Sequence, residues 1–99
     1  MACYDVYPNP DGEGWLLDVQ SDLLTKTKTR VVIPLLPGET VPPPLKRLHP
    51  VFDIGGRRVV LATHLLAAVP GSMLRERTAN LAARRDEITG ALDMLFQGF

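Results

Sequence analysis

Nine prolines in a chain of 99 residues are the feature that most limits how this sequence can fold. A proline ring fixes the backbone φ angle and removes an N–H donor, so it interrupts helices and the interior of sheets. We therefore expect many short elements joined by turns rather than long helices. The densest group, Pro42–Pro44, favours extended polyproline geometry. We interpret it as a stiff connector, with a P-x-x-P recognition motif as the alternative.

The C-terminal stretch, residues 81–99, carries a clear helical pattern. Its apolar side chains recur at the i, i+3, i+4, i+7, i+8 spacing of an amphipathic helix, at Ile88, Ala91, Leu92, Leu95 and Phe96. We predict a helix of roughly 15 residues, with Asn80 as its N-cap and with Ile88, Leu92 and Leu95 against the core. A chain end is usually polar and frayed. The apolar end from Phe96 to Phe99 is therefore interpreted as a contact surface.

Short β-branched or alternating segments predict strands at Ala2–Tyr7, Trp15–Gln20, Arg30–Leu35, Val51–Ile54 and Arg57–Ala62. The first two are expected to form an antiparallel hairpin. Gly55 and Gly56 supply the positive φ angles of a two-residue type I′ turn between the last two. Pro34 lies inside the third and is expected at an edge, an end or a bulge. With no repeat and no linker, we predict one domain over residues 1–99, a small barrel or curled sheet covered by the helix.

Composition excludes several classes of function. Eleven basic residues balance eleven acidic ones, so no overall positive field is available to hold nucleic acid. The single cysteine, Cys3, cannot form an intrachain disulfide, which indicates a reducing compartment; we place it in the core. No apolar run approaches the ~20 residues that span a bilayer, and the N-terminus does not resemble a signal peptide. We therefore expect a cytoplasmic protein with no membrane partner.

No residue pattern indicates catalysis or metal binding. The chain has no phosphate-binding P-loop and no dinucleotide-binding G-x-G-x-x-G. His49 and His64 lack a second ligand pair at zinc-site spacing, and we interpret them as a turn residue and a strand-end residue. Asp18 and Asp22 are either paired carboxylates for acid–base chemistry or caps of local N–H groups, and we favour caps. The charged run Arg84–Glu87 is interpreted as a solvated helix face. We expect no enzyme activity, no cofactor and no metal, and a protein that acts by contact.

Several segments, in order and nearly end to end, resemble the CcdB toxins of toxin–antitoxin systems. They are Asp18–Asp22, Arg30–Leu35, Leu48–Ile54, Ala68–Pro70 with Ser72, and the helix from Asp86 to Phe96 with Gly98. The resemblance implies a mainly β fold with one C-terminal helix, a small SH3-like barrel of the CcdB/MazF type, assembled as a two-fold homodimer.

The resemblance also implies a function without catalysis. Such a toxin belongs to a type II toxin–antitoxin module, binds the A subunit of DNA gyrase and traps the gyrase–DNA cleavage complex. A cognate antitoxin wraps it with a segment that is disordered until bound. Contact with DNA is only indirect, through the antitoxin complex, and the associated roles are plasmid maintenance and transcription autoregulation.

Gyrase-binding positions carry over by resemblance to seven residues: Leu23, Leu24, Asp93, Phe96, Gln97, Gly98 and Phe99. Asp93 stands where the well-studied toxin has an amide, and Phe99 replaces a terminal aliphatic residue. Gln97 is the main departure, because the potent gyrase poisons of the family carry tryptophan there. Aromatic anchors commonly carry about 2 kcal/mol of an interface, and stacking on a cation adds about 0.5–2 kcal/mol. Loss of two such rings, one per protomer, weakens binding on the order of a thousandfold.

Two alternatives stay open at this point. One is a ribonuclease toxin on the same barrel, with His49, Arg30, Arg57 or Arg58 on an RNA-binding groove. The other is a family member that has lost toxicity and persists as an antitoxin-binding or regulatory protein. The replacement of the family's tryptophan by Gln97 is the observation that suggests it.

Overall fold

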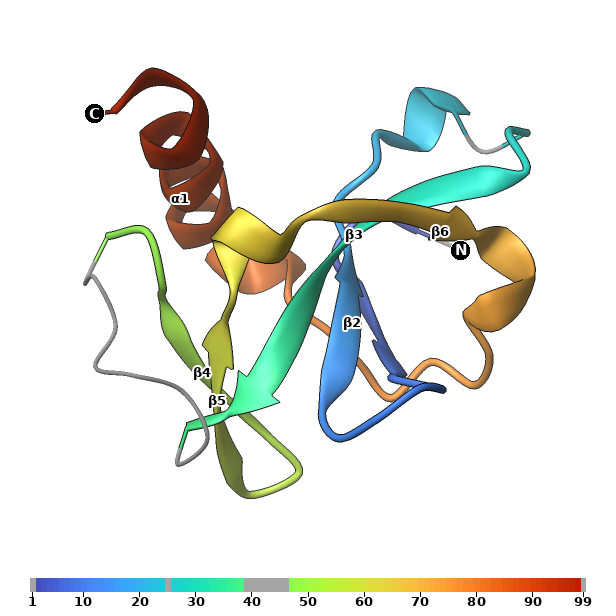
Figure 1. Ribbon diagram of the computed structural model, residues 1–99, viewed down its shortest axis with the longest axis horizontal. Coiled ribbons are helices and arrows are strands. Elements are labelled where there is room, and N and C mark those ends of the chain that lie inside the picture. The colour runs from blue at the N-terminus through green and yellow to red at the C-terminus, as the bar shows by residue number, and fades with distance from the viewer. Residues whose placement is uncertain (1, 25, 39–46, 99) are drawn as a thin grey trace.

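The structure is a computed structural model that describes residues 2–24, 26–38 and 47–98 (Figure 1). The proline run 42–44 and Phe99 lie outside the described residues. In chain order the elements are β1 (Asp5–Pro8), β2 (Trp15–Asp18), η1 (Asp22–Leu24), β3 (Thr29–Pro37), β4 (Val51–Ile54), β5 (Arg57–Leu61), η3 (Thr63–Leu65), β6 (Ala67–Pro70), η4 (Gly71–Met73), β7 (Ala79–Asn80), η5 (Ala82–Arg84) and α1 (Arg85–Gln97). The elements named η are single 3₁₀ turns.

The long strand β3 lies at the centre of an antiparallel sheet. Over the described residues the strand order is β4-β5-β3-β2-β1-β7, and β6 also pairs with β3. One edge of β3 pairs with β2, and the other edge pairs with β6 over residues 29–32 and with β5 over residues 35–37. This change of partner along one edge curls the sheet into a nearly closed barrel, with α1 beside it (Figure 1). The predicted fold class, mainly β with one C-terminal helix, is confirmed.

Pro34 lies inside this central strand, which corrects the expectation that it must sit at an edge, an end or a bulge. Its carbonyl accepts a hydrogen bond from the N–H of Ala62 at 2.9 Å, so its missing N–H faces the same side of β3. On that side Pro34 falls between the residues paired with β6 and those paired with β5. No ladder donor is needed at this position, and proline is tolerated in the middle of the sheet.

Both predicted hairpins are present. Val6 pairs with Leu17 between β1 and β2, and Ile54 pairs with Arg57 between β4 and β5. Gly55 and Gly56 have φ angles of 58° and 83°, as a type I′ turn requires.

The first strand begins later than predicted, at Asp5 rather than Ala2. Tyr4 has a positive φ of 71° and closes a turn, in which its N–H bonds to the carbonyl of Asp18 at 2.6 Å. Cys3 lies in this turn, half-buried, and not in the core as predicted. Burial raises the pKa of its thiol. The reason for both differences is that the chain bends back over the end of β2 before it enters the sheet.

Two groups of buried apolar residues hold the sheet. The main core lies inside the barrel and consists of Val6, Leu17, Ile33, Leu35, Phe52, Ile54, Val59, Leu61, Ile88 and Ala91. A smaller cluster consists of Tyr7, Leu16, Val32 and Leu74. Adjacent residues of a strand point to opposite faces of the sheet. Leu16 and Leu17 are therefore both buried because both faces are covered here, which explains why the alternation in β2 is imperfect.

Helix α1 has 13 residues and starts at Arg85, after η5. Asn80 is not its N-cap: its Oδ1 accepts the N–H of Ala82 at 2.9 Å and so caps the 3₁₀ turn instead. Ile88 and Ala91 are fully buried, Leu92 is partly buried against the core, and Leu95 is half-buried. Within the described part of the chain, no helix has the length and hydropathy to cross a bilayer.

Arg84 joins the start of the helix to β4. Its guanidinium carbon lies 4.3 Å from the ring centroid of Phe52, and its Nη2 donates to the carbonyl of Val51 at 3.3 Å. Two hydrogen bonds to Glu87, at 2.7 and 2.8 Å, complete its contacts. The charged run is thus not simply a solvated face, because Arg84 attaches α1 to the barrel.

Candidate protein-contact surfaces

Four large apolar side chains are about half or more exposed among the described residues. They are Leu23 (93% exposed), Phe96 (70%), Leu24 (51%) and Leu65 (48%). Exposed apolar side chains that form a contiguous patch are typical of contact sites for another protein, whereas single ones are common on any protein surface. Three of the four are positions that the sequence predicted for contact, and Leu65 is new.

The C-terminal end of α1 forms the first surface, here called the helix end and made of Asp93, Phe96, Gln97 and Gly98. All four are exposed. Gly98 adopts the left-handed conformation, with φ 79°, and donates its N–H to the carbonyl of Met94 at 3.0 Å. This C-cap stops the helix cleanly. Phe96 is therefore held on an ordered helix, with no described residue covering it.

The loop between β2 and β3 forms the second surface, here called the tip and made of Leu23 and Leu24 in η1. The N–H of Leu23 bonds to the hydroxyl of Ser21 at 3.1 Å, and the N–H of Leu24 bonds to the Ser21 carbonyl at 3.0 Å. In Figure 1 the tip and the helix end lie on opposite sides of the view. A single copy of the chain therefore does not bring the two predicted contact regions together.

Sequence reasoning missed the exposure of the segment around β6. Leu65, Ala67, Ala68 and Pro70 are all exposed, although the stretch reads as a continuous apolar run. The sequence signal that could have revealed this exposure is the lack of alternating polar residues in β6. Among the described residues, β6 pairs with β3 on one side only and is therefore an edge strand. Such an edge is open to pairing or packing with another chain.

Asp18 and Asp22 do not form a pair of catalytic carboxylates. Asp18 is completely buried and lies 2.7 Å from Nη2 of Arg30, which is 1% exposed. Its second oxygen accepts the N–H of Gln20 at 3.0 Å, which confirms the predicted cap. Burial raises the pKa of Asp18, and the hydrogen bonds from Gln20 and Arg30 offset part of the rise. Asp22 instead accepts the N–H of Cys3 at 2.7 Å and ties the N-terminal turn to the tip.

The two histidines, which we interpreted separately from the sequence, lie in contact. Nε2 of His49 is 2.9 Å from Nδ1 of His64, and their ring centroids are 4.9 Å apart. Burial and the neighbouring His64 lower the pKa of His49. Among the described residues, no group of three or more His, Cys, Asp or Glu side chains is placed to hold a metal ion.

The residues considered for a ribonuclease do not share one groove. His49 precedes β4, whereas Arg57 and Arg58 follow the turn at the far end of the β4–β5 hairpin. Arg57 lies over the ring of Trp15, at 5.9 Å from its centroid. Arg30 is buried with Asp18. The fold thus distributes these cations over three separate places.

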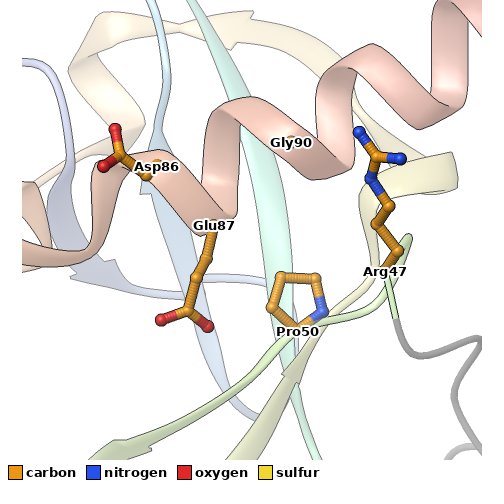
Figure 2. A pocket seen from close by; sticks show the side chains of 5 residues that line it. All are labelled: Arg47, Pro50, Asp86, Glu87 and Gly90. Atoms are coloured by element: carbon orange, nitrogen blue, oxygen red, sulfur yellow. The ribbon is translucent and has the colours of Figure 1, made fainter. Parts of the chain in front are cut away.

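A pocket of about 300 Å³ lies between α1 and the segment that leads into β4. Figure 2 shows Arg47 and Pro50 on one side, facing Asp86, Glu87 and Gly90 on the helix. The pocket has mixed charge from Arg47, Asp86 and Glu87, and Glu87 is already paired with Arg84. It adds no chemistry to the two contact surfaces.

Comparison with known proteins agrees with the fold. The family model described as "CcdB protein" matches residues 3–98. Among solved structures, the chain is similar to the Mycobacterium tuberculosis toxin MazF-mt6, with a TM-score of 0.75 and 13% sequence identity. The match covers 93% of this chain and 95% of that chain. At such low identity the likeness concerns the fold alone.

Proposed function

This chain belongs to the CcdB family, and on that premise we propose that it is the toxin of a toxin–antitoxin module and that it binds the A subunit of DNA gyrase. In this proposal the toxin acts by contact, traps the gyrase–DNA cleavage complex, and makes or breaks no bond itself. The cognate antitoxin is its second partner.

The observation that carries the proposal is the exposure of Leu23 and Phe96 on ordered elements. Leu23 is 93% exposed on η1, and Phe96 is 70% exposed on α1. The chain has a full core elsewhere, in which sixteen of the described apolar residues are buried. Leaving these two side chains in water brings the fold no benefit, because burial of a Leu or Phe is worth about 1.5–3 kcal/mol. Their exposure fits a surface that is completed by a partner.

A homodimer is the assembly that would unite the two surfaces. The exposed segment around β6, with Leu65, Ala67 and Ala68, offers an apolar edge to a second copy. A two-fold contact presents each surface twice, so two helix ends and two tips are available to one target. We expect the purified protein to elute as a dimer, and a monomer that persists at all concentrations would contradict this step.

Gln97 sets the expected strength of the contact. It is exposed at the last residue of α1, beside Phe96, where a tryptophan would present a large ring. Glutamine donates and accepts hydrogen bonds but buries less apolar area. We therefore expect weaker gyrase binding than in family members with tryptophan. A Gln97→Trp variant should bind more tightly, because aromatic anchors dominate interfaces.

The test is a gyrase cleavage assay with purified toxin. Supercoiled DNA and gyrase should yield more linear, protein-bound DNA when toxin is added at micromolar concentration. The matched control is a protein that lacks residues 97–99, which should fold normally and trap nothing. If supercoiling proceeds unchanged with the full-length toxin and with Gln97→Trp, gyrase is not the target.

Expression without antitoxin separates the remaining readings. Growth arrest with intact RNA supports the gyrase proposal, whereas cleaved RNA supports the ribonuclease alternative. Normal growth with abundant folded protein supports a non-toxic, antitoxin-binding role, which Gln97 motivates.

A further inference from the structure

We propose that Gln20 is a positioning residue that holds the tip, Leu23 and Leu24, in the conformation that binds a partner. The inference rests on the proposed function, because the tip is one of the two contact surfaces assigned there. It adds a residue that touches no partner itself and acts through the backbone of the tip.

Every polar group of the Gln20 side chain has a hydrogen-bond partner. Its Nε2 donates to the carbonyl of Leu24 at 3.1 Å and to Oγ1 of Thr27 at 2.7 Å. Its Oε1 accepts the N–H of Val31 at 3.0 Å. Gln20 is 8% exposed, so these bonds are largely shielded from water. One side chain thus joins both sides of the tip to β3.

The backbone of Gln20 is held in place by hydrogen bonds to the buried ion pair of Asp18 and Arg30. Its N–H donates to Oδ1 of Asp18 at 3.0 Å, and its carbonyl accepts from Nη2 of Arg30 at 3.4 Å. Asp18 and Arg30 are both buried and belong to adjacent strands. Gln20 therefore connects the loop that carries the tip to two buried residues of the sheet.

The tip needs such support because its own contacts are few. Leu23 is 93% exposed, so side-chain packing contributes almost nothing to its placement. An isolated three-residue 3₁₀ turn has poor hydrogen-bond geometry and little intrinsic stability. The carbonyl of Leu24 gains three donors, from Gln20 Nε2 and from the N–H and hydroxyl of Thr27. Removing the Gln20 donor leaves Leu24 with the two Thr27 donors alone, while the bond between Asp22 and the N–H of Cys3 still holds the start of the turn.

Preorganisation raises affinity because a loop that is already ordered loses less entropy when it binds. We expect that loss of the Gln20 side-chain bonds lowers the affinity for the gyrase target about tenfold. The loss of affinity should arise through the tip, although the N–H of Val31 in β3 also loses its Gln20 acceptor. This expectation distinguishes a positioning role from a general structural one.

The experiment is a double-mutant cycle measured by binding of toxin dimers to the purified A subunit of gyrase. Gln20→Met keeps the size of the side chain and removes its hydrogen bonds, and Leu23→Ala removes the exposed contact. We expect Gln20→Met to weaken binding about tenfold in the wild-type background and to have a smaller effect in the Leu23→Ala background, where Leu24 is the contact of the tip that remains. An equal effect of Gln20→Met in both backgrounds, or no effect in either, would overturn the proposal.

Two additional variants keep the test valid if Gln20→Met folds poorly. Thr27→Val removes the exposed hydroxyl to which Gln20 donates, and should reproduce part of the loss. Thr29→Val makes the same chemical change at an exposed residue whose side chain has no bond to Gln20. It should bind as the wild type does. Equal affinities for the two threonine variants would argue against the proposal.

A readout without gyrase separates this proposal from the proposed function. Backbone ¹⁵N relaxation should show an ordered tip in the wild type and a mobile tip in Gln20→Met, with the strands unchanged. If the wild type does not bind gyrase but shows this change, the target assignment fails and the positioning role stands. If the tip is equally ordered in both proteins, the positioning role fails.

Discussion

Replacing Asp18 by Asn should cost much more stability than replacing Glu87 by Gln, although each carboxylate lies 2.7 Å from an arginine nitrogen. The difference is burial. Asp18 and Arg30 are 0% and 1% exposed, whereas Glu87 and Arg84 are 48% and 43% exposed. Loss of one partner from a buried pair leaves an uncompensated charge and costs about 3–5 kcal/mol. An exposed pair contributes only about 0–1 kcal/mol because water and salt screen it.

Burial raises the pKa of Asp18, so the loss of its own charge removes a desolvation penalty. The cost of Asp18→Asn comes from Arg30, which stays charged and buried without its carboxylate, and we therefore apply the larger figure. The amide oxygen of Asn can still accept the N–H of Gln20, so the substitution mainly removes charge. Arg30 has no other carboxylate nearby to take the place of Asp18 among the contacts described, and its Nη1 already lacks a hydrogen-bond partner among the described residues. Domains of this size have a free energy of unfolding of about 5–15 kcal/mol. Asp18→Asn should therefore remove a large part of the total stability.

The measurement is equilibrium unfolding in urea at pH 7, with the free energy of unfolding taken from the midpoint at a common slope. It should be repeated at tenfold higher protein concentration, because association changes apparent stability. A loss for Asp18→Asn within about 1 kcal/mol of the loss for Glu87→Gln would refute the reasoning from burial. The double variant Asp18→Leu with Arg30→Met should recover part of the loss, since replacing both ions removes the unpaired charge.

Three further results are expected. Gly90→Ala should stabilise the protein by about 0.5–1 kcal/mol, because a Cβ there meets no atom of the described residues within 4 Å; a lower Tm would contradict this prediction. Asp5 is buried, which opposes its ionisation, but hydrogen bonds from Asn80 and Ala2 and the charge of Arg77 outweigh this and lower its pKa from the usual 3.8. Asp5 thus contributes stability above pH 3.8 that is lost as pH falls through its folded pKa. The free energy of unfolding of Asp5→Asn, measured at a series of acidic pH values, should therefore fall less steeply with decreasing pH than that of the wild type. Phe96→Ala should change the stability of the folded chain by less than about 0.5 kcal/mol, since Phe96 is 70% exposed, and should weaken gyrase binding at least about thirtyfold in a titration.

Sequence patterns predicted the structure correctly where interactions between residues close in sequence determine it. The pair Gly55 and Gly56 predicts its turn because only residues that tolerate positive φ fit a type I′ hairpin, and both adopt such angles. The helical spacing from Ile88 onward predicts which face is buried, and Ile88 and Ala91 are fully buried. The same spacing places Phe96 on the apolar stripe, so its exposure was predicted instead from the apolar chain end and from the family resemblance.

Local rules failed where contacts between distant segments decide the outcome. Pro34 is tolerated in a central strand only because β5 and β6 share one edge of β3. The residues next to Pro34 in sequence give no indication of this pairing. His49 and His64 meet because β4 and β5 pair, which brings their flanking residues together. The support of the tip by Gln20 likewise depends on Val31 and Arg30 of the next strand. The sequence therefore predicts which residues are offered for contact better than it predicts what holds them.

The two contact surfaces have a common construction that explains how one small chain can be both stable and ready to bind. In each, the exposed apolar residue is separated from the residues that anchor its element. The helix end is anchored about two turns before Phe96 by Ile88, and at the start of the helix by Arg84 on Phe52. The tip is anchored by Gln20 on the buried ion pair. Substitutions at Leu23 or Phe96 can then change the partner without altering the core. Substitutions at the anchors should affect stability and contact together.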